Sequence, residues 1–131
     1  MTLDAKNFSV TLTANDLARS LRFYADGLGF KVGDKFEQDG KIMGAMLEAG
    51  AAKFGISQDD FVKGRDRVKG LGIGLYIETD QDLEALAKGA KVAGIKFEQE
   101  LSPLPWGPMA FIVRDPDGFR ITIASPDKPK S

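Results

Sequence analysis

The sequence predicts an α+β fold of two tandem βαβββ modules, whose eight strands form a cup-shaped, mostly antiparallel sheet assembly. A strand pattern followed by a helix pattern occurs near the N-terminus, and the same order recurs after residue 70. Ser9 and Gly74 are matched landmarks 65 residues apart, and so are Gly29 and Gly94. A constant offset of this kind indicates an internal repeat. Chance similarity of two βα units is the alternative, because short alternating patterns are common.

The first module begins with residues 8–13, where apolar and small polar side chains alternate as in a half-buried strand. Asp16 offers a helix N-cap, and Gly29 marks the end of the helix that follows. The apolar side chains at helical spacing are Leu17, Leu21, Tyr24 and Leu28. Three more strands are expected around residues 30–32, 42–47 and 53–57.

The second module repeats this order, with alternation over residues 73–77 and a capping-box-like segment at residues 79–82. The apolar side chains of its helix are Leu83, Leu86, Ala87, Ala90 and Ala93. Strands are expected at residues 95–97, 109–114 and 119–124. The last two are joined by residues 115–118, a tight-turn sequence in which proline fixes φ and glycine permits positive φ.

A single domain is expected over residues 1–131, because a chain of this length with 43% hydrophobic residues can bury a core of its own. Module one is expected to span about residues 7–58 and module two about residues 70–126. The linker between them, about residues 59–69, is rich in charge and glycine.

The composition excludes several classes of function. A net charge of −1 gives no electrostatic footprint for nucleic acid. No segment resembles a signal peptide or a membrane helix, and the absence of cysteine gives no indication of an oxidising compartment, so a cytoplasmic protein is expected. There is also no histidine, so any acid–base chemistry must come from carboxylates, Lys, Tyr, Ser or Thr.

Two segments resemble a known family. Residues 10–30 contain VTLT, DL, SLRFY and LGF, and residues 106–121 contain WG followed by RDPDGFRI. They resemble the opening and closing motifs of the vicinal-oxygen-chelate superfamily, the glyoxalase/bleomycin resistance protein/dioxygenase family. The resemblance covers nearly the whole chain and implies the glyoxalase-like fold, whereas one fold hosts many activities.

The metalloenzymes of this family hold a divalent metal at four cup-facing positions through His, Gln or Glu. The resemblance places Ser9, Gly55, Gly74 and Thr122 at these positions. Two glycines and two hydroxyls supply neither the charge nor the donor strength of a metal site. We therefore expect no metal and no cofactor. Glu48 is the nearest candidate acid if the alignment slips, but one carboxylate cannot hold a metal.

Strand alternation predicts which side chains line the cup. The expected ligand-binding residues are Thr11, Tyr76, Glu78, Arg120 and Thr122, together with Phe111 or Val113 and, on a proline-flanked loop, Trp106. Trp106 can close over a flat ligand at low entropic cost. Arg120 should pair with Glu78, with Glu48 or with an acidic group of the ligand. The alternatives are an ordinary exposed sheet face and a Trp that caps the core.

The residues and the resemblance together favour a metal-independent protein that binds or sequesters a small organic molecule, similar to the bleomycin-resistance branch. A flat aromatic or amphipathic ligand is expected, and the family resemblance implies a homodimer. The alternative is an enzyme, a lyase or an extradiol-type dioxygenase, in which a metal-independent variant would use Glu48, Glu78, Tyr76 or Arg120 for acid–base work. A purely structural or interaction role has no motif in its favour.

Overall fold

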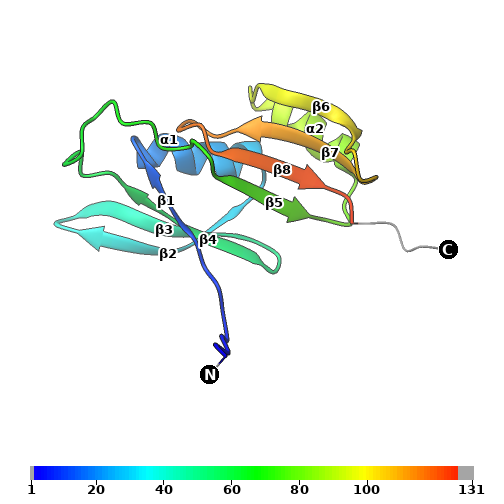
Figure 1. Ribbon diagram of the computed structural model, residues 1–131. Helices are drawn as coiled ribbons and strands as arrows, with labels where there is room; N and C mark the ends of the chain where they lie inside the picture. The colour runs from blue at the N-terminus through cyan, green and yellow to red at the C-terminus, as the bar shows by residue number, and fades with distance from the viewer. Residues whose placement is uncertain (1, 127–131) are drawn as a thin grey trace.

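The computed structural model describes residues 2–126, and its elements follow the order βαβββ twice (Figure 1). A π-helical segment, η1, continues the first helix. The first module comprises β1 (Thr11–Ala14), α1 (Leu17–Arg22), η1 (Phe23–Gly27), β2 (Lys31–Gln38), β3 (Lys41–Ala49) and β4 (Ala52–Gln58). The second comprises β5 (Gly74–Glu78), α2 (Leu83–Val92), β6 (Phe97–Pro103), β7 (Met109–Arg114) and β8 (Arg120–Ala124).

The strands form two four-stranded sheets of identical topology, ordered β1-β4-β3-β2 and β5-β8-β7-β6. In each sheet the first and last strands of the module pair in parallel, and the other pairs are antiparallel. The register repeats as well, because Thr11 lies opposite Gly55 in one sheet and Tyr76 lies opposite Thr122 in the other. The predicted α+β fold with two tandem modules is confirmed.

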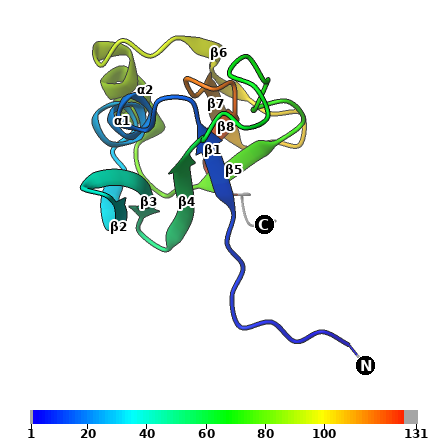
Figure 2. The ribbon, with the colours of Figure 1, turned by 90° about the vertical axis from the view of Figure 1, so that its left-hand side faces the viewer.

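The helices lie side by side, and the two sheets cover them from different sides (Figure 2). Leu17 and Leu83, the first residues of the two helices, are buried in one apolar core that takes side chains from both modules. Leu21 and Leu86 pack against that core, as their spacing predicts. Asp16 and Asp82 cap the helices, each accepting a backbone hydrogen bond in the first turn.

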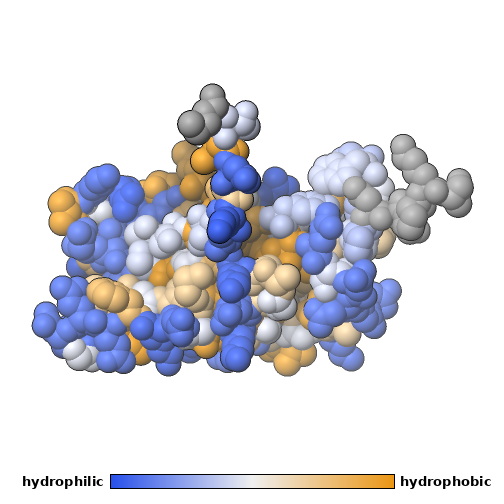
Figure 3. Space-filling view, turned by 90° about the horizontal axis from the view of Figure 1, so that it is seen from below, coloured by the Kyte–Doolittle hydropathy of each residue, from blue (hydrophilic) through white to orange (hydrophobic). Residues whose placement is uncertain are grey.

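The chain before β1 differs from the prediction. The first strand begins at Thr11 instead of Phe8, because the backbone pairing with β4 ends where the amide of Gly55 donates to the carbonyl of Val10. The preceding residues form an extended arm that projects from the body (Figures 1 and 2), and Phe8 is 86% exposed. Viewed from below, apolar surface flanks this arm (Figure 3). No helix among residues 2–126 is long and apolar enough to cross a membrane.

A buried ion pair joins the two ends of the linker, and one of its members also contacts the first module. The ammonium of Lys69 lies 2.9 Å from the carboxylate of Asp59 and also donates to Asn15 at the end of β1. The side chains of Lys69 and Asp59 are both largely buried, whereas Arg67, which also contacts Asp59, is more exposed. The hydrogen bond from Lys69 is the main influence that lowers the pKa of Asp59.

A close backbone approach follows the linker. A Cβ atom added to Gly70 would lie 2.1 Å from the carbonyl carbon of Gly118, in the turn between β7 and β8. Only glycine fits at position 70 without moving this turn. The linker thus ends against the closing motif of the second module.

Candidate functional site

A hollow lies on the outer face of the second sheet, with a volume of about 230 Å³. It is lined by Gly74, Leu75, Tyr76, Leu104, Trp106, Ile112, Arg120 and Thr122. Three strands and one loop contribute to this lining. Tyr76 and Gly74, like Arg120 and Thr122, are alternate residues of a strand and so lie on the same face of the sheet. Four of the predicted ligand-binding residues meet here: Tyr76, Trp106, Arg120 and Thr122. We call this hollow the tryptophan face.

Two aromatic rings form its wall. The ring centroids of Tyr76 and Trp106 are 6.3 Å apart, and the ring planes are inclined by 38°. Trp106 is 62% exposed and Tyr76 is 45% exposed, so Trp106 does not cap the core. Large aromatic rings left open to water beside a hollow are typical of ligand-binding surfaces.

The charge of the tryptophan face is set by three side chains. Arg120 pairs with Glu98 on β6 at 3.2 Å, and the other oxygen of this carboxylate lies 2.8 Å from Arg114. The predicted partners were Glu78, Glu48 or an acidic group of the ligand. Glu78 lies at the opposite end of β5, because Arg120 is paired with Gly74 and Glu78 with Ala124. One carboxylate shared by two guanidinium groups leaves excess positive charge beside the hollow.

Three predicted ligand-binding residues lie elsewhere. Phe111 is fully buried in the core, where its ring stacks on Phe97, and the alternative Val113 is also a core residue. Ile112, between them, forms part of the floor of the tryptophan face. The prediction that Phe111 or Val113 faces the ligand was therefore wrong, because the neighbouring residue Ile112 is the one on that face.

Glu78 and Thr11 line other hollows. Glu78 is exposed at a groove near the end of β5. Thr11 is exposed on the outer face of the first sheet, where its hydroxyl lies beside Gly55. That face has a hollow of about 510 Å³ with Met43, Met46 and Phe36 in its lining. We call it the methionine face. It shares no lining residue with the tryptophan face.

The four family metal positions do not fit a divalent cation. Gly55 and Gly74 have no side chain, Ser9 is exposed before β1 starts, and Thr122 offers one neutral hydroxyl. The register makes Gly55 and Thr122 equivalent, since each lies opposite matched residues of the two repeats. Within residues 2–126 no three His, Cys, Asp or Glu side chains are grouped so that they could hold a metal ion.

Comparisons with known proteins agree with this architecture. The model of the Glyoxalase/Bleomycin resistance protein/Dioxygenase superfamily matches residues 8–123. Among solved structures, TioX from Micromonospora sp. ML1 is similar, with a TM-score of 0.74 and 20% identity over 92% of this chain and 98% of that chain.

Two further structures are similar over 95% of this chain and 98% of their own, each with a TM-score of 0.69. An integron cassette protein from V. cholerae is 25% identical, and virulence protein STM3117 from Salmonella typhimurium is 26% identical. A search of the curated proteins finds none that matches the chain. The fold, the repeated register and the family match over residues 8–123 together establish that the chain belongs to the Glyoxalase/Bleomycin resistance protein/Dioxygenase superfamily.

Proposed function

We propose that this protein binds a small organic molecule at the tryptophan face without the help of a metal ion. The main support is the pair of exposed rings, Trp106 and Tyr76, beside a hollow that also contains Arg120 and Thr122. Aromatic walls supply apolar contact area, while a guanidinium and a hydroxyl fix the orientation of a ligand. A flat molecule that carries an acidic or neutral polar group fits this chemistry.

The charge argues for an acidic group on the ligand. Arg120 already has a carboxylate partner, but Glu98 must satisfy Arg114 as well. A ligand carboxylate could therefore approach Arg120 without displacing Glu98, and the resulting hydrogen bonds would be charge-assisted. A cationic ligand would meet repulsion instead.

Trp106 provides the test, because it is the only tryptophan in the chain. 2-Naphthoate, 2-naphthalenemethanol and a naphthylmethyl ammonium salt present the same ring with negative, neutral and positive groups. We expect a saturable change in Trp106 fluorescence that is strongest with naphthoate. Arg120→Ala should weaken naphthoate binding roughly tenfold, while Glu98 keeps Arg114 as its partner and preserves the fold.

Lys88→Ala removes an exposed cation from α2 and is the matched control. It should leave the titration unchanged. If no naphthalene derivative and no compound released from protein purified from its host alters Trp106 fluorescence, the proposed site is wrong. Metal-dependent turnover of the methylglyoxal–glutathione adduct would instead favour a lyase.

The proposed assembly is a homodimer. The tryptophan and methionine faces both open outward, and β2 and β6 are edge strands, which soluble proteins commonly cover by association. Light scattering at micromolar concentration should give twice the chain mass of 14.2 kDa. A mass of one chain would exclude the dimer and leave the fluorescence test unaffected.

A further inference from the structure

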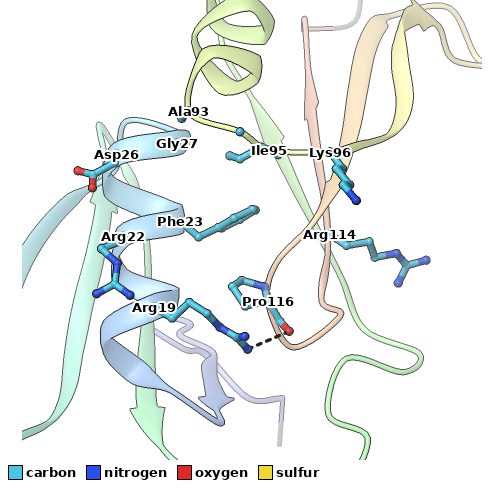
Figure 4. Close-up of a pocket in the computed structure, with 11 residues that line it drawn as sticks. Arg19, Arg22, Phe23, Asp26, Gly27, Ala93, Ile95, Lys96, Arg114 and Pro116 are labelled. Carbon is cyan, nitrogen blue, oxygen red and sulfur yellow. Dashed lines mark hydrogen bonds between the residues drawn. The ribbon is translucent and has the colours of Figure 1, made fainter.

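Another hollow lies between the first helix and the segment that follows α2. It has a volume of about 460 Å³, and its lining includes Arg19, Phe23, Ile95, Lys96, Arg114 and Pro116 (Figure 4). Its lining comes from the first helix, the segment after α2 and the β7–β8 connection, so both modules build it. We call it the basic groove.

The groove combines an apolar floor with cationic ends. Phe23 points from the first helix toward Ile95, with Pro116 below them in this view (Figure 4). Arg19 reaches the same space, where its guanidinium donates to the carbonyl of Pro116 at 3.5 Å. Lys96 lies at the other end of the floor.

Positive charge dominates this lining. Four cationic residues and one acidic residue, Asp26, contribute to it, although the whole chain has a net charge of −1. The side chains of Arg22 and Asp26 point away from the cavity (Figure 4). Arg114 is engaged by Glu98. In the part of the chain that the structure describes, Arg19, Arg22 and Lys96 are in no ion pair. An excess of positive charge makes a site attractive to an anion.

The repeat provides an internal comparison. A groove of about 520 Å³ occupies the equivalent place in the other module, because its lining residues Leu28, Gly29 and Phe30 match Ala93, Gly94 and Ile95 at the repeat offset of 65. That groove contains Glu78 and Asp80 and no cation. The fold therefore does not require cations at this position, because only one of the two grooves related by the repeat contains them.

We infer that the basic groove is a binding site for a small organic anion, either a phosphate monoester or a carboxylic acid, with an aromatic or aliphatic body. The body would lie on Phe23 and Ile95, and the anionic group would be held by Arg19 at one end of this floor, while Lys96 adds positive charge at the other end. Its volume is that of a small-molecule site. This site shares no lining residue with the tryptophan face, although Arg114 in its lining and Arg120 in that face both pair with Glu98.

Phenyl phosphate is the probe, titrated into the ¹⁵N-labelled full chain and followed by amide chemical shifts. Saturable shifts should appear in residues 19–27 and 93–96. Arg19→Gln combined with Lys96→Gln should weaken this binding at least about tenfold, because the charge-assisted contact with Arg19 and the electrostatic attraction of Lys96 are both lost. Raising NaCl from ~20 mM to ~200 mM should weaken it several-fold, since the Debye length shortens.

The controls separate the groove from the tryptophan face. Lys53→Gln, an exposed cation on β4, should leave the titration unchanged, and benzyl alcohol should give no saturable shift because it lacks the charge. Any second set of shifts near Trp106 should respond to Arg120→Ala and not to the Arg19/Lys96 variant. The inference is overturned if shifts occur only near Trp106, if the double variant binds as tightly as the wild type, or if no shift saturates.

Discussion

The hydroxyl of Tyr24 donates a 2.7 Å hydrogen bond to the carboxylate of Asp115, joining the first helix of one module to the β7–β8 turn of the other. Both side chains are buried. The second oxygen of Asp115 accepts from the backbone amides of Asp117 and Phe119. The two family-like motifs of the sequence therefore meet in one buried contact.

Tyr24→Phe should lower the free energy of unfolding by about 1–3 kcal/mol, because it leaves a buried carboxylate oxygen without its donor. Urea denaturation measures the change. Tyr76→Phe is the matched control, since Tyr76 is substantially exposed and its substitution should stay within about 0.5 kcal/mol. Equal stability of the two variants would show that the contact contributes nothing.

Asp115 should make stability depend on pH in the acidic range. Burial is the largest influence and raises the pKa of Asp115 above the ordinary value of 3.8, although its hydrogen bonds with Tyr24 and two amides lower it. Between the ordinary and the raised pKa the folded state binds more protons, so this group favours folding increasingly as the pH falls through its folded pKa. The stability of the wild type relative to Asp115→Asn should therefore rise between pH 7 and pH 4. A difference that is constant over this range would contradict the raised pKa.

Lys69→Met should lower the thermal midpoint by roughly 5 °C or more, because the buried carboxylate of Asp59 loses its closest cation. The lowered pKa of Asp59 means that its stabilising effect is present above the ordinary pKa of 3.8 and is lost as the pH falls through the folded value. The gap between wild type and variant should thus be largest near neutral pH and shrink in acid. Lys63→Met, on the exposed linker, should shift the midpoint little. Calorimetry at several pH values checks all three outcomes.

The protein should retain much less than one metal ion per chain after dialysis against Ni²⁺, Zn²⁺, Mg²⁺, Mn²⁺ or Fe²⁺. The reason is the poor donor set formed by Ser9, Gly55, Gly74 and Thr122. Elemental analysis by mass spectrometry measures the ratio. Stoichiometric metal that EDTA removes would mean that other side chains supply the ligands.

The sequence predicted the fold because periodicity and the repeat offset are local signals. β7 spans exactly the predicted residues 109–114. Its side chains could not be assigned to faces, however, because Ala110 through Val113 are all buried and a strand buried on both faces has no period of two. Phe111 was consequently assigned to the wrong face.

The partner of Arg120 was missed for a different reason. Glu98 reaches Arg120 only through the pairing of β6 with β7, which has two register shifts. Such shifts cannot be inferred from spacing along the chain. The basic groove was also not predicted, because Arg19, Lys96 and Arg114 come from separate segments and form no charge run. The repeat offset is the signal that could have found it, because the offset relates the lining residues of one groove to those of its counterpart.

The identical topology of the two sheets has a genetic consequence. Each hollow has a counterpart that the repeat relates to it, so a substitution that alters one hollow leaves its counterpart intact. The methionine and tryptophan faces form one such pair, and the basic groove and its acidic counterpart form another. After an internal duplication, each member of a pair is free to acquire its own chemistry. A chain of 131 residues can in this way evolve separate binding specificities without acquiring another domain.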